Sequence, residues 1–175
     1  MALTASVATL MTVIGASSSH ANGVGVPGGG RPDRQAGVSM DLQFPATPDP
    51  VGVCSFPVTV SDVEFAVVEK HYADGSTKGA GRHVVRIINE TRKVSVVRDI
   101  SGPGRTYTDA VGVFHYLLTG ASLTWVWAGK DTTGTVPVGL YVRHGNVDYD
   151  GDLNLLSYTG SAENLCETLA LPRPS

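Results

Sequence analysis

The sequence predicts an all-β protein, an antiparallel meander of about eight or nine strands that forms a barrel or a sandwich. Short runs rich in Val, Ile, Thr, Tyr and Trp recur from residue 51 onward, and turn-forming residues separate them. Apolar and polar residues alternate within several runs. The alternation is clearest where Leu123, Trp125 and Trp127 share one face and Ser122 and Thr124 share the other. No convincing amphipathic helix interrupts the series.

The first 21 residues have the features of a secretory signal peptide. An apolar run from Ala2 to Ala16 is followed by small residues at Ser19 and Ala21, which places the predicted cleavage between Ala21 and Asn22. The run is shorter than the roughly 20 residues that a membrane-spanning helix needs. It has no Lys or Arg before it, and a buried N-terminal helix is the alternative. We therefore expect a secreted, extracellular protein without a membrane span.

Residues 22–50 contain six Gly and five Pro and few large apolar side chains. This composition predicts a disordered leader. Within it, Gly23 to Gly28 satisfies the G-x-G-x-x-G pattern of dinucleotide-binding loops, but no strand precedes it, and Pro27 and the following glycines oppose a helix. We expect no cofactor, and a single β domain over residues 51–172.

The predicted strands follow in chain order, and the turns between them have hairpin chemistry. They span residues 56–61, 65–72, 83–89, 93–100, 105–109, 111–119, 122–128, 138–144 and 153–159. The turns are Asp74-Gly75, Asn89 to Thr91, Ser101 to Gly104, Gly120-Ala121 and Asp150-Gly151. These short connections favour a barrel or half-barrel, although the sequence does not decide against a sandwich. We expect one or two helical turns around residues 163–169.

Two cysteines bracket the predicted domain. Cys54 stands just before the first strand and Cys166 just after the last. In an exported protein such a pair predicts a disulfide, which would close a loop of about 113 residues and stabilise the fold by roughly 4–5 kcal/mol. Two unrelated buried thiols are the alternative.

Three segments resemble a group of small exported β-rich actinobacterial proteins of unknown function. They are Cys54 to Val58 (CSFPV), the turn Ser101 to Gly104 (SGPG), and Leu165 to Leu169 (LCETL). The resemblance covers about residues 54–170. It implies secretion, a disulfide and an all-β fold, and it implies no activity, substrate or catalytic residue.

Residues 146–154 are rich in oxygen ligands. Asn146, Asp148 and Asp150 fall at the first, third and fifth positions of a calcium loop, and Gly151 takes the turn position. However, Ser157 stands where a bidentate Glu is expected, and the flanking residues have strand character. A solvated hairpin loop is the favoured interpretation, so we predict no metal site.

No catalytic residue is predicted. His71 and His83 lie on either side of the Asp74-Gly75 turn, but zinc needs a third ligand and none is evident. The sequence lacks the G-x-S-x-G and H-E-x-x-H motifs. The alternative is a small secreted enzyme whose site at a barrel mouth is assembled from dispersed residues such as His115, Tyr116 and Asp148.

The charge is unevenly distributed. The formal net charge of −3 argues against nucleic-acid binding, yet residues 70–105 hold eight Lys and Arg against three Asp and Glu. Two hairpins would present Arg82, Arg86, Arg92, Lys93 and Arg98 to an anionic wall polymer or a lipid headgroup. The alternative is a solvated face balanced by acidic neighbours.

Trp125 and Trp127 would be core residues or a platform for a small ligand. Together these features favour a non-catalytic extracellular binding or envelope-associated module.

Overall fold

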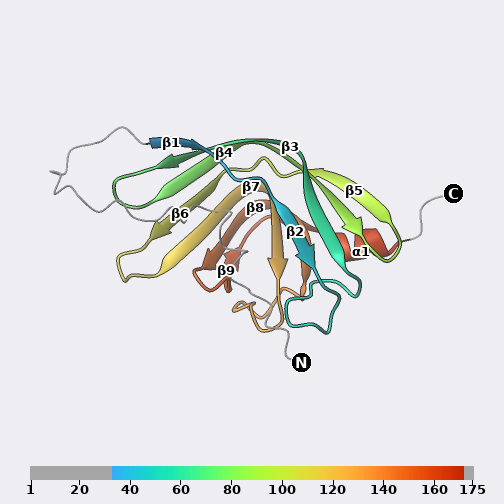
Figure 1. Cartoon of the computed structure of the whole chain (residues 1–175). Coiled ribbons are helices and arrows are strands. Elements are labelled where there is room, and N and C mark those ends of the chain that lie inside the picture. The colour runs from blue at the N-terminus through green and yellow to red at the C-terminus, as the bar shows by residue number, and fades with distance from the viewer. Residues whose placement is uncertain (1–32, 172–175) are drawn as a thin grey trace, which may run out of the picture.

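The computed structural model describes residues 33–171, which form one antiparallel sheet of ten strands and one short helix (Figure 1). The strands are β1 (Asp33–Ala36), β2 (Asp41–Phe44), β3 (Val58–His71), β4 (Thr77–Asn89), β5 (Val94–Asp99), β6 (Gly104–Thr108), β7 (Phe114–Val126), β8 (Gly139–Asp150), β9 (Leu155–Tyr158) and β10 (Ser161–Asn164). The helix α1 spans Leu165–Ala170. The predicted all-β antiparallel class and the C-terminal helical turn are confirmed.

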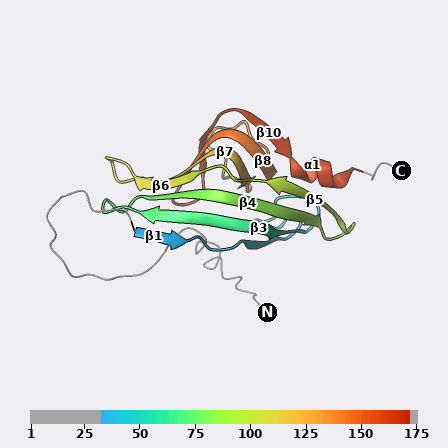
Figure 2. The same ribbon diagram turned by 90° about the horizontal axis from the view of Figure 1, so that it is seen from above.

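The sheet is strongly curved and remains open. Its main hydrogen-bonded order is β1-β3-β4-β6-β7-β8-β10, while β2 pairs with β3, β5 with β4, and β9 with β8. Seen from above, β1, β3, β4 and β5 form one layer, and β7, β8 and β10 arch over it (Figure 2). Within residues 33–171 no ladder joins the two ends, so the sheet does not close into the barrel that the short connections favoured.

Two long strands replace four shorter predicted ones. In β3 the register with β4 shifts between Asp62 and Glu64. Val60 faces inward before this irregularity and Phe65 faces inward after it, so the inward-facing residues change from even-numbered to odd-numbered ones. In β7 the predicted turn at Gly120-Ala121 is wrong. Gly120 adopts a φ of 73° and bends the strand while its pairing with Gly145 of β8 continues.

The sheet begins earlier in the chain than the sequence suggested. Residues 33–36 and 41–44 are strands, and Leu42 and Phe44 of β2 are each only 3% exposed. The leader predicted over residues 22–50 is therefore wrong from residue 33 onward, because alternating apolar residues pair β2 with β3. The predicted signal peptide, its Ala21–Asn22 cleavage site and the segment from Gly23 to Gly28 lie outside the described residues.

The main core lies between the two layers. It joins Val60 of β3 and Ile87 of β4 to Leu140 of β8 and Leu165 of α1, all fully buried. The disulfide between Cys54 and Cys166, with Cα atoms 5.3 Å apart, ties the β2–β3 connection to α1. It thus fastens together two ends of the sheet that no strand pairing joins within residues 33–171. No helix in residues 33–171 has the length and apolar character needed to cross a bilayer.

Candidate functional site

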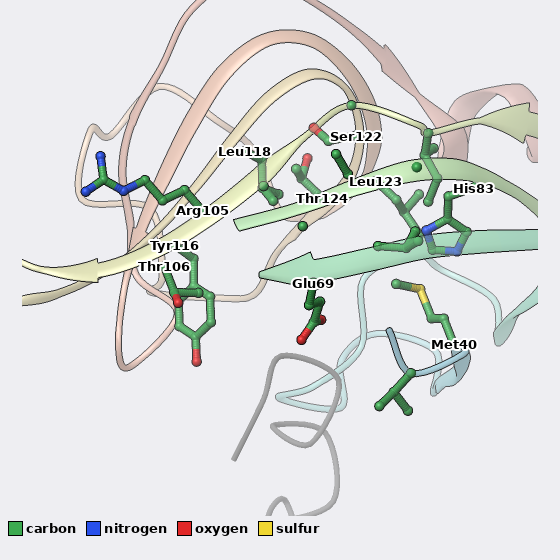
Figure 3. A pocket seen from close by; sticks show the side chains of 18 of the residues that line it. Met40, Glu69, His83, Arg105, Thr106, Tyr116, Leu118, Ser122, Leu123 and Thr124 are labelled. Atoms are coloured by element: carbon green, nitrogen blue, oxygen red, sulfur yellow. The ribbon is translucent and has the colours of Figure 1, made fainter. Parts of the chain in front are cut away.

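A cavity of about 230 Å³ lies against the concave side of the curved sheet (Figure 3). Its walls come from β2, β3, β4, β6 and β7 and from the segment that precedes β2. Most of the lining side chains are apolar, among them Met40, Leu42, Phe65, Leu118 and Leu123. The residues that build it are distant in the sequence, so the cavity exists only when the sheet is folded over.

Missing side chains create much of this space. Gly79 of β4 and Gly104 of β6 line the cavity, whereas a Cβ at Gly81 would meet the Ala66 carbonyl oxygen at 2.1 Å and not the empty space. Gly79 pairs with Glu69 on one side and with Gly104 on the other, so adjacent strands place no side chain at these positions. The concave side is therefore hollow here, whereas farther along β4 the buried side chains of Val85 and Ile87 fill it.

One wall of the cavity is an unpaired strand edge. Only Phe114 to Leu118 of β7 pair with β6; beyond the bend at Gly120 the described strands pair β7 with β8, and the Ala121 carbonyl also accepts the Gly102 amide at 2.7 Å. Figure 1 shows this half of β7 running beside β2. The rings of Trp125 and Phe44 lie 5.6 Å apart across the gap. Trp125 therefore both packs against the core and lines the cavity, which combines the two roles that the sequence left open.

The hydroxyl of Ser122 is the unusual polar group of this wall. Ser122 is 5% exposed, and its Oγ has no hydrogen-bond partner among the described residues. Two neighbouring polar groups are paired: Thr124 Oγ1 accepts from Arg143 at 3.1 Å, and Tyr149 donates to the Trp125 carbonyl at 3.0 Å. Among the described residues, His71 Nε2 and Trp127 Nε1 are also buried without a hydrogen-bond partner, but neither residue lines the cavity. Burial raises the pKa of Tyr149 to about 12, so this phenol stays protonated as a donor. Because buried polar groups in proteins are nearly always paired, the Ser122 hydroxyl calls for a partner.

A second polar feature of the cavity is Glu69 of β3. Figure 3 shows the Glu69 and Tyr116 side chains extending from the sheet in the same direction. The Glu69 carboxylate lies 3.5 Å from His71 Nε2, a distance at the limit of a hydrogen bond, and its side chain is only 13% exposed. The cavity thus has an apolar body, a buried hydroxyl on one wall and a carboxylate on another.

The cavity wall also contains a histidine–carboxylate pair that the sequence did not predict. His83 Nε2 lies 2.7 Å from Asp62 Oδ1, and His83 lines the cavity. Asp62 Oδ2 also accepts the Met40 amide at 2.7 Å, and the ring of Phe65 packs edge-on against His83. No motif links residues 62 and 83, and only the shifted register of β3 places both on the concave side.

Of the three residues suggested for an enzyme site, His115 and Asp148 lie together on one face of the sheet, and Tyr116 lies on the other. His115 Nδ1 lies 3.0 Å from Asp148 Oδ2, and its ring stacks on Tyr107. The hydrogen bond to Asp148 is the main cause that raises the pKa of His115. Since successive residues of a strand point to opposite faces, Tyr116 lines the cavity whereas His115 lies on the other side.

The predicted oxygen-rich loop is a hairpin between β8 and β9. The Asp150 carboxylate accepts the amides of Asp152 and Asn154, as in a tight turn, and Asp148 is engaged by His115. In the part of the chain that the structure describes, no group of three or more His, Cys, Asp or Glu side chains is placed to hold a metal ion. His71 and His83 are likewise apart, each with its own partner.

The predicted basic face is largely neutralised within the molecule. Arg82 pairs with Glu64 and Asp99, Arg98 with Glu163, and Lys93 with Glu90. The Arg92 guanidinium donates to the carbonyl oxygens of Ala170 and Leu171 at the end of α1. These contacts favour the interpretation in which acidic neighbours balance the face.

Comparison with known proteins adds no family: no family model, no curated protein and no solved structure matches this chain.

Proposed function

We propose that this chain is a secreted binding protein that holds a small, mostly apolar molecule bearing one polar group in the cavity beneath its sheet. The observation that carries the proposal is the Ser122 hydroxyl, which is buried in an apolar wall without a hydrogen-bond partner in residues 33–171. A ligand that hydrogen-bonds this hydroxyl would remove the cost of leaving it unpaired.

The volume limits the size of the ligand. A cavity of about 150 Å³ holds benzene, so 230 Å³ corresponds to roughly ten non-hydrogen atoms. Drug-sized ligands need about 300 Å³ or more. A single aromatic ring with a short side chain, or a medium-length alkyl chain, therefore fits this space.

The wall chemistry selects the polar group. The Glu69 carboxylate on the cavity wall disfavours anionic ligands, while Arg105, which also belongs to the lining, is directed away from the cavity (Figure 3), and Ser122 can either donate or accept a hydrogen bond. A neutral ligand with a hydroxyl group satisfies Ser122 without charge repulsion, so we favour phenols and alcohols over carboxylic acids.

Export is the second part of the proposal. Disulfides persist mainly in oxidising compartments, and the Cys54–Cys166 bond is built into the core of the fold. The apolar N-terminal segment and its small residues before Asn22 are consistent with a cleaved signal. Cell fractionation with intact-mass analysis tests this part, and the expected mature protein starts at Asn22 and lies in the medium.

Binding is tested with a matched pair of probes, 4-propylphenol and propylbenzene, which differ by one hydroxyl. Titration calorimetry should give tighter binding of the phenol by about two- to tenfold, the contribution of one hydrogen bond. In Ser122→Ala the two probes should bind equally. Failure of both probes to bind the wild-type protein would reject the proposal.

An enzymatic role is the second candidate, and the His83–Asp62 pair is the observation that favours it. A histidine held by a carboxylate in a cavity wall is the arrangement of many general bases. Asp62 already holds the Met40 amide, which suits a structural role equally well. Turnover of any bound phenyl ester that disappears in His83→Gln, while binding of 4-propylphenol persists, would favour the enzyme.

A further inference from the structure

Four cations stand in one row across four adjacent strands, on the face of the sheet opposite the cavity. Arg34 of β1 is the register partner of Lys70 of β3, Lys70 is the partner of Lys78 of β4, and Lys78 is the partner of Arg105 of β6. Directly opposite residues project from the same face of a sheet. We call these four residues the cationic row.

The row lines a single groove of about 560 Å³. Adjacent strands lie about 4.8 Å apart, so the four Cα positions span roughly 14 Å. Figure 3 shows Arg105 directed away from the cavity. Two residues along the strands, the next row on this face is Ala36, Val68 and Ala80, whose small or apolar side chains add no negative charge.

Repulsion between the like charges of the cationic row destabilises the fold, and no ion pair within residues 33–171 offsets this cost. Like charges directly opposite each other destabilise a sheet, and here three such pairs follow in succession. Elsewhere in the described chain Arg82, Lys93 and Arg98 form ion pairs with carboxylates, whereas Arg86, Arg92 and Lys130 form none. Within residues 33–171 no member of the row forms an ion pair.

Two local contacts involve the row but do not neutralise it. The Lys78 ammonium lies 5.7 Å from the centre of the Tyr72 ring, and the Arg105 guanidinium lies 4.7 Å from that of Tyr107. Asp74 at the tip of the β3–β4 hairpin has a lowered pKa, caused first by its hydrogen bonds with Ser76 and only weakly by Arg105. Protection of sheet edges does not explain the row, since Lys70 and Lys78 lie on interior strands.

We propose that the cationic row binds a linear phosphate-bearing polymer that lies in the groove across the strands. A single phosphate ion reaches only neighbouring cations, whereas a chain with repeated charges engages all four. Because the cations line a groove, an extended chain can enter between them, while a flat bilayer surface meets mainly the rim. The groove and the cavity share Gly79, Ala80, Gly104 and Arg105 in their linings, but three of the four cations line the groove alone, and the proposal does not depend on the small-molecule function.

The test compares the full chain with two double variants that remove equal charge. Lys70→Gln/Lys78→Gln interrupts the row, and Arg86→Gln/Lys93→Gln removes two exposed cations elsewhere. Binding of linear inorganic polyphosphate is measured by titration calorimetry at several salt concentrations, with monophosphate as the reference. Thermal unfolding checks each variant, and the row variant should remain folded because its substitutions relieve repulsion.

We expect polyphosphate to bind at least about tenfold more tightly than monophosphate, since electrostatic affinity rises with the number of charges neutralised. In the row variant the affinity should fall about tenfold or more, and the slope of log affinity against log salt should fall by about half, from four contacts to two. The control should change the affinity by less than about twofold. Arg34→Gln/Arg105→Gln, which keeps both interior lysines, provides a second row variant.

Equal losses in the row and control variants would overturn the proposal, because they would reflect net charge alone. Binding to phosphatidylglycerol vesicles without binding to polyphosphate would assign the row to a membrane surface. Equal affinity for polyglutamate and polyphosphate would reject the preference for phosphate.

Discussion

Breaking the Cys54–Cys166 disulfide should lower the free energy of unfolding by about 5 kcal/mol. The bond joins residues 112 apart in sequence, and the chain-entropy relation gives about that value for a loop of this length. The structural position strengthens the effect, because the bond ties the β2–β3 connection to α1 where the described strands form no pairing. For a domain of this size the corresponding loss in Tm is about 15–20 °C.

Urea unfolding of oxidised and reduced wild-type protein, followed by tryptophan fluorescence, measures this difference directly. Cys54→Ala/Cys166→Ala is the companion variant, since the reduced protein keeps both sulfur atoms and the variant does not. Similar losses in the two would assign the effect to the covalent link. A loss below about 1 kcal/mol on reduction would refute the reasoning, because the two layers would then hold together without the bond.

Three further predictions follow from buried groups and backbone contacts. Ser122→Ala should leave the free energy of unfolding in urea unchanged or raise it by about 1 kcal/mol. Thr124→Val removes a paired hydroxyl and should lower it by about 1–3 kcal/mol. An equally large loss in Ser122→Ala would contradict the unpaired state of the Ser122 hydroxyl. Gly102→Ala places a Cβ 2.2 Å from a carbonyl oxygen of β7 and should lower the free energy of unfolding by about 3 kcal/mol. Gly112→Ala, where φ is 88° but the surrounding space is open, should lower it by about 1 kcal/mol. Equal losses in the two variants would show that β7 moves to relieve the contact. The pKa of His115 is raised above its ordinary 6.5 in the folded protein. Protonated His115 therefore stabilises the fold fully below pH 6.5, and this contribution is lost as the pH rises through the folded pKa. Tm measured from pH 5 to 9 should decline over this range, and His115→Gln should flatten the decline.

The sequence was most informative where alternation runs without interruption. The apolar positions of residues 138–144 predicted a strand, and β8 includes most of them with Leu140 and Val142 in the core. The placement of the two cysteines at the ends of the domain was enough to predict their bond. These features depend on local pattern and on chain order, both of which a single sequence contains.

Features that depend on long-range register were not predictable. β2 looked like leader because its four residues gain their burial only by pairing with Val58 to Ser61, well beyond it in the chain. Gly120 has the signature of a turn, yet in β7 it only bends a continuous strand. The register shift beside Asp62 changes which residues of β3 face inward and places Asp62 next to His83. Nothing in the local sequence pattern indicates this shift.

The cavity could not be read from the sequence for a related reason. Gly79 and Gly104 have the appearance of turn residues, whereas they leave space on the concave side of the sheet. Ser122 stands on the side of the alternating run opposite Leu123 and Trp125, and the run gives no sign that this side is buried. Its burial follows from the bend at Gly120 and the fold of β7 toward β2.

The most direct test of the binding function is a methyl NMR titration of the full chain with 4-propylphenol. We expect chemical-shift changes at Met40, Leu118 and Leu123, which line the cavity, and little change at Leu155 and Leu165, which are fully buried elsewhere. Changes of equal size at all five methyl-bearing residues, or none at saturating probe, would contradict a binding site beneath the sheet.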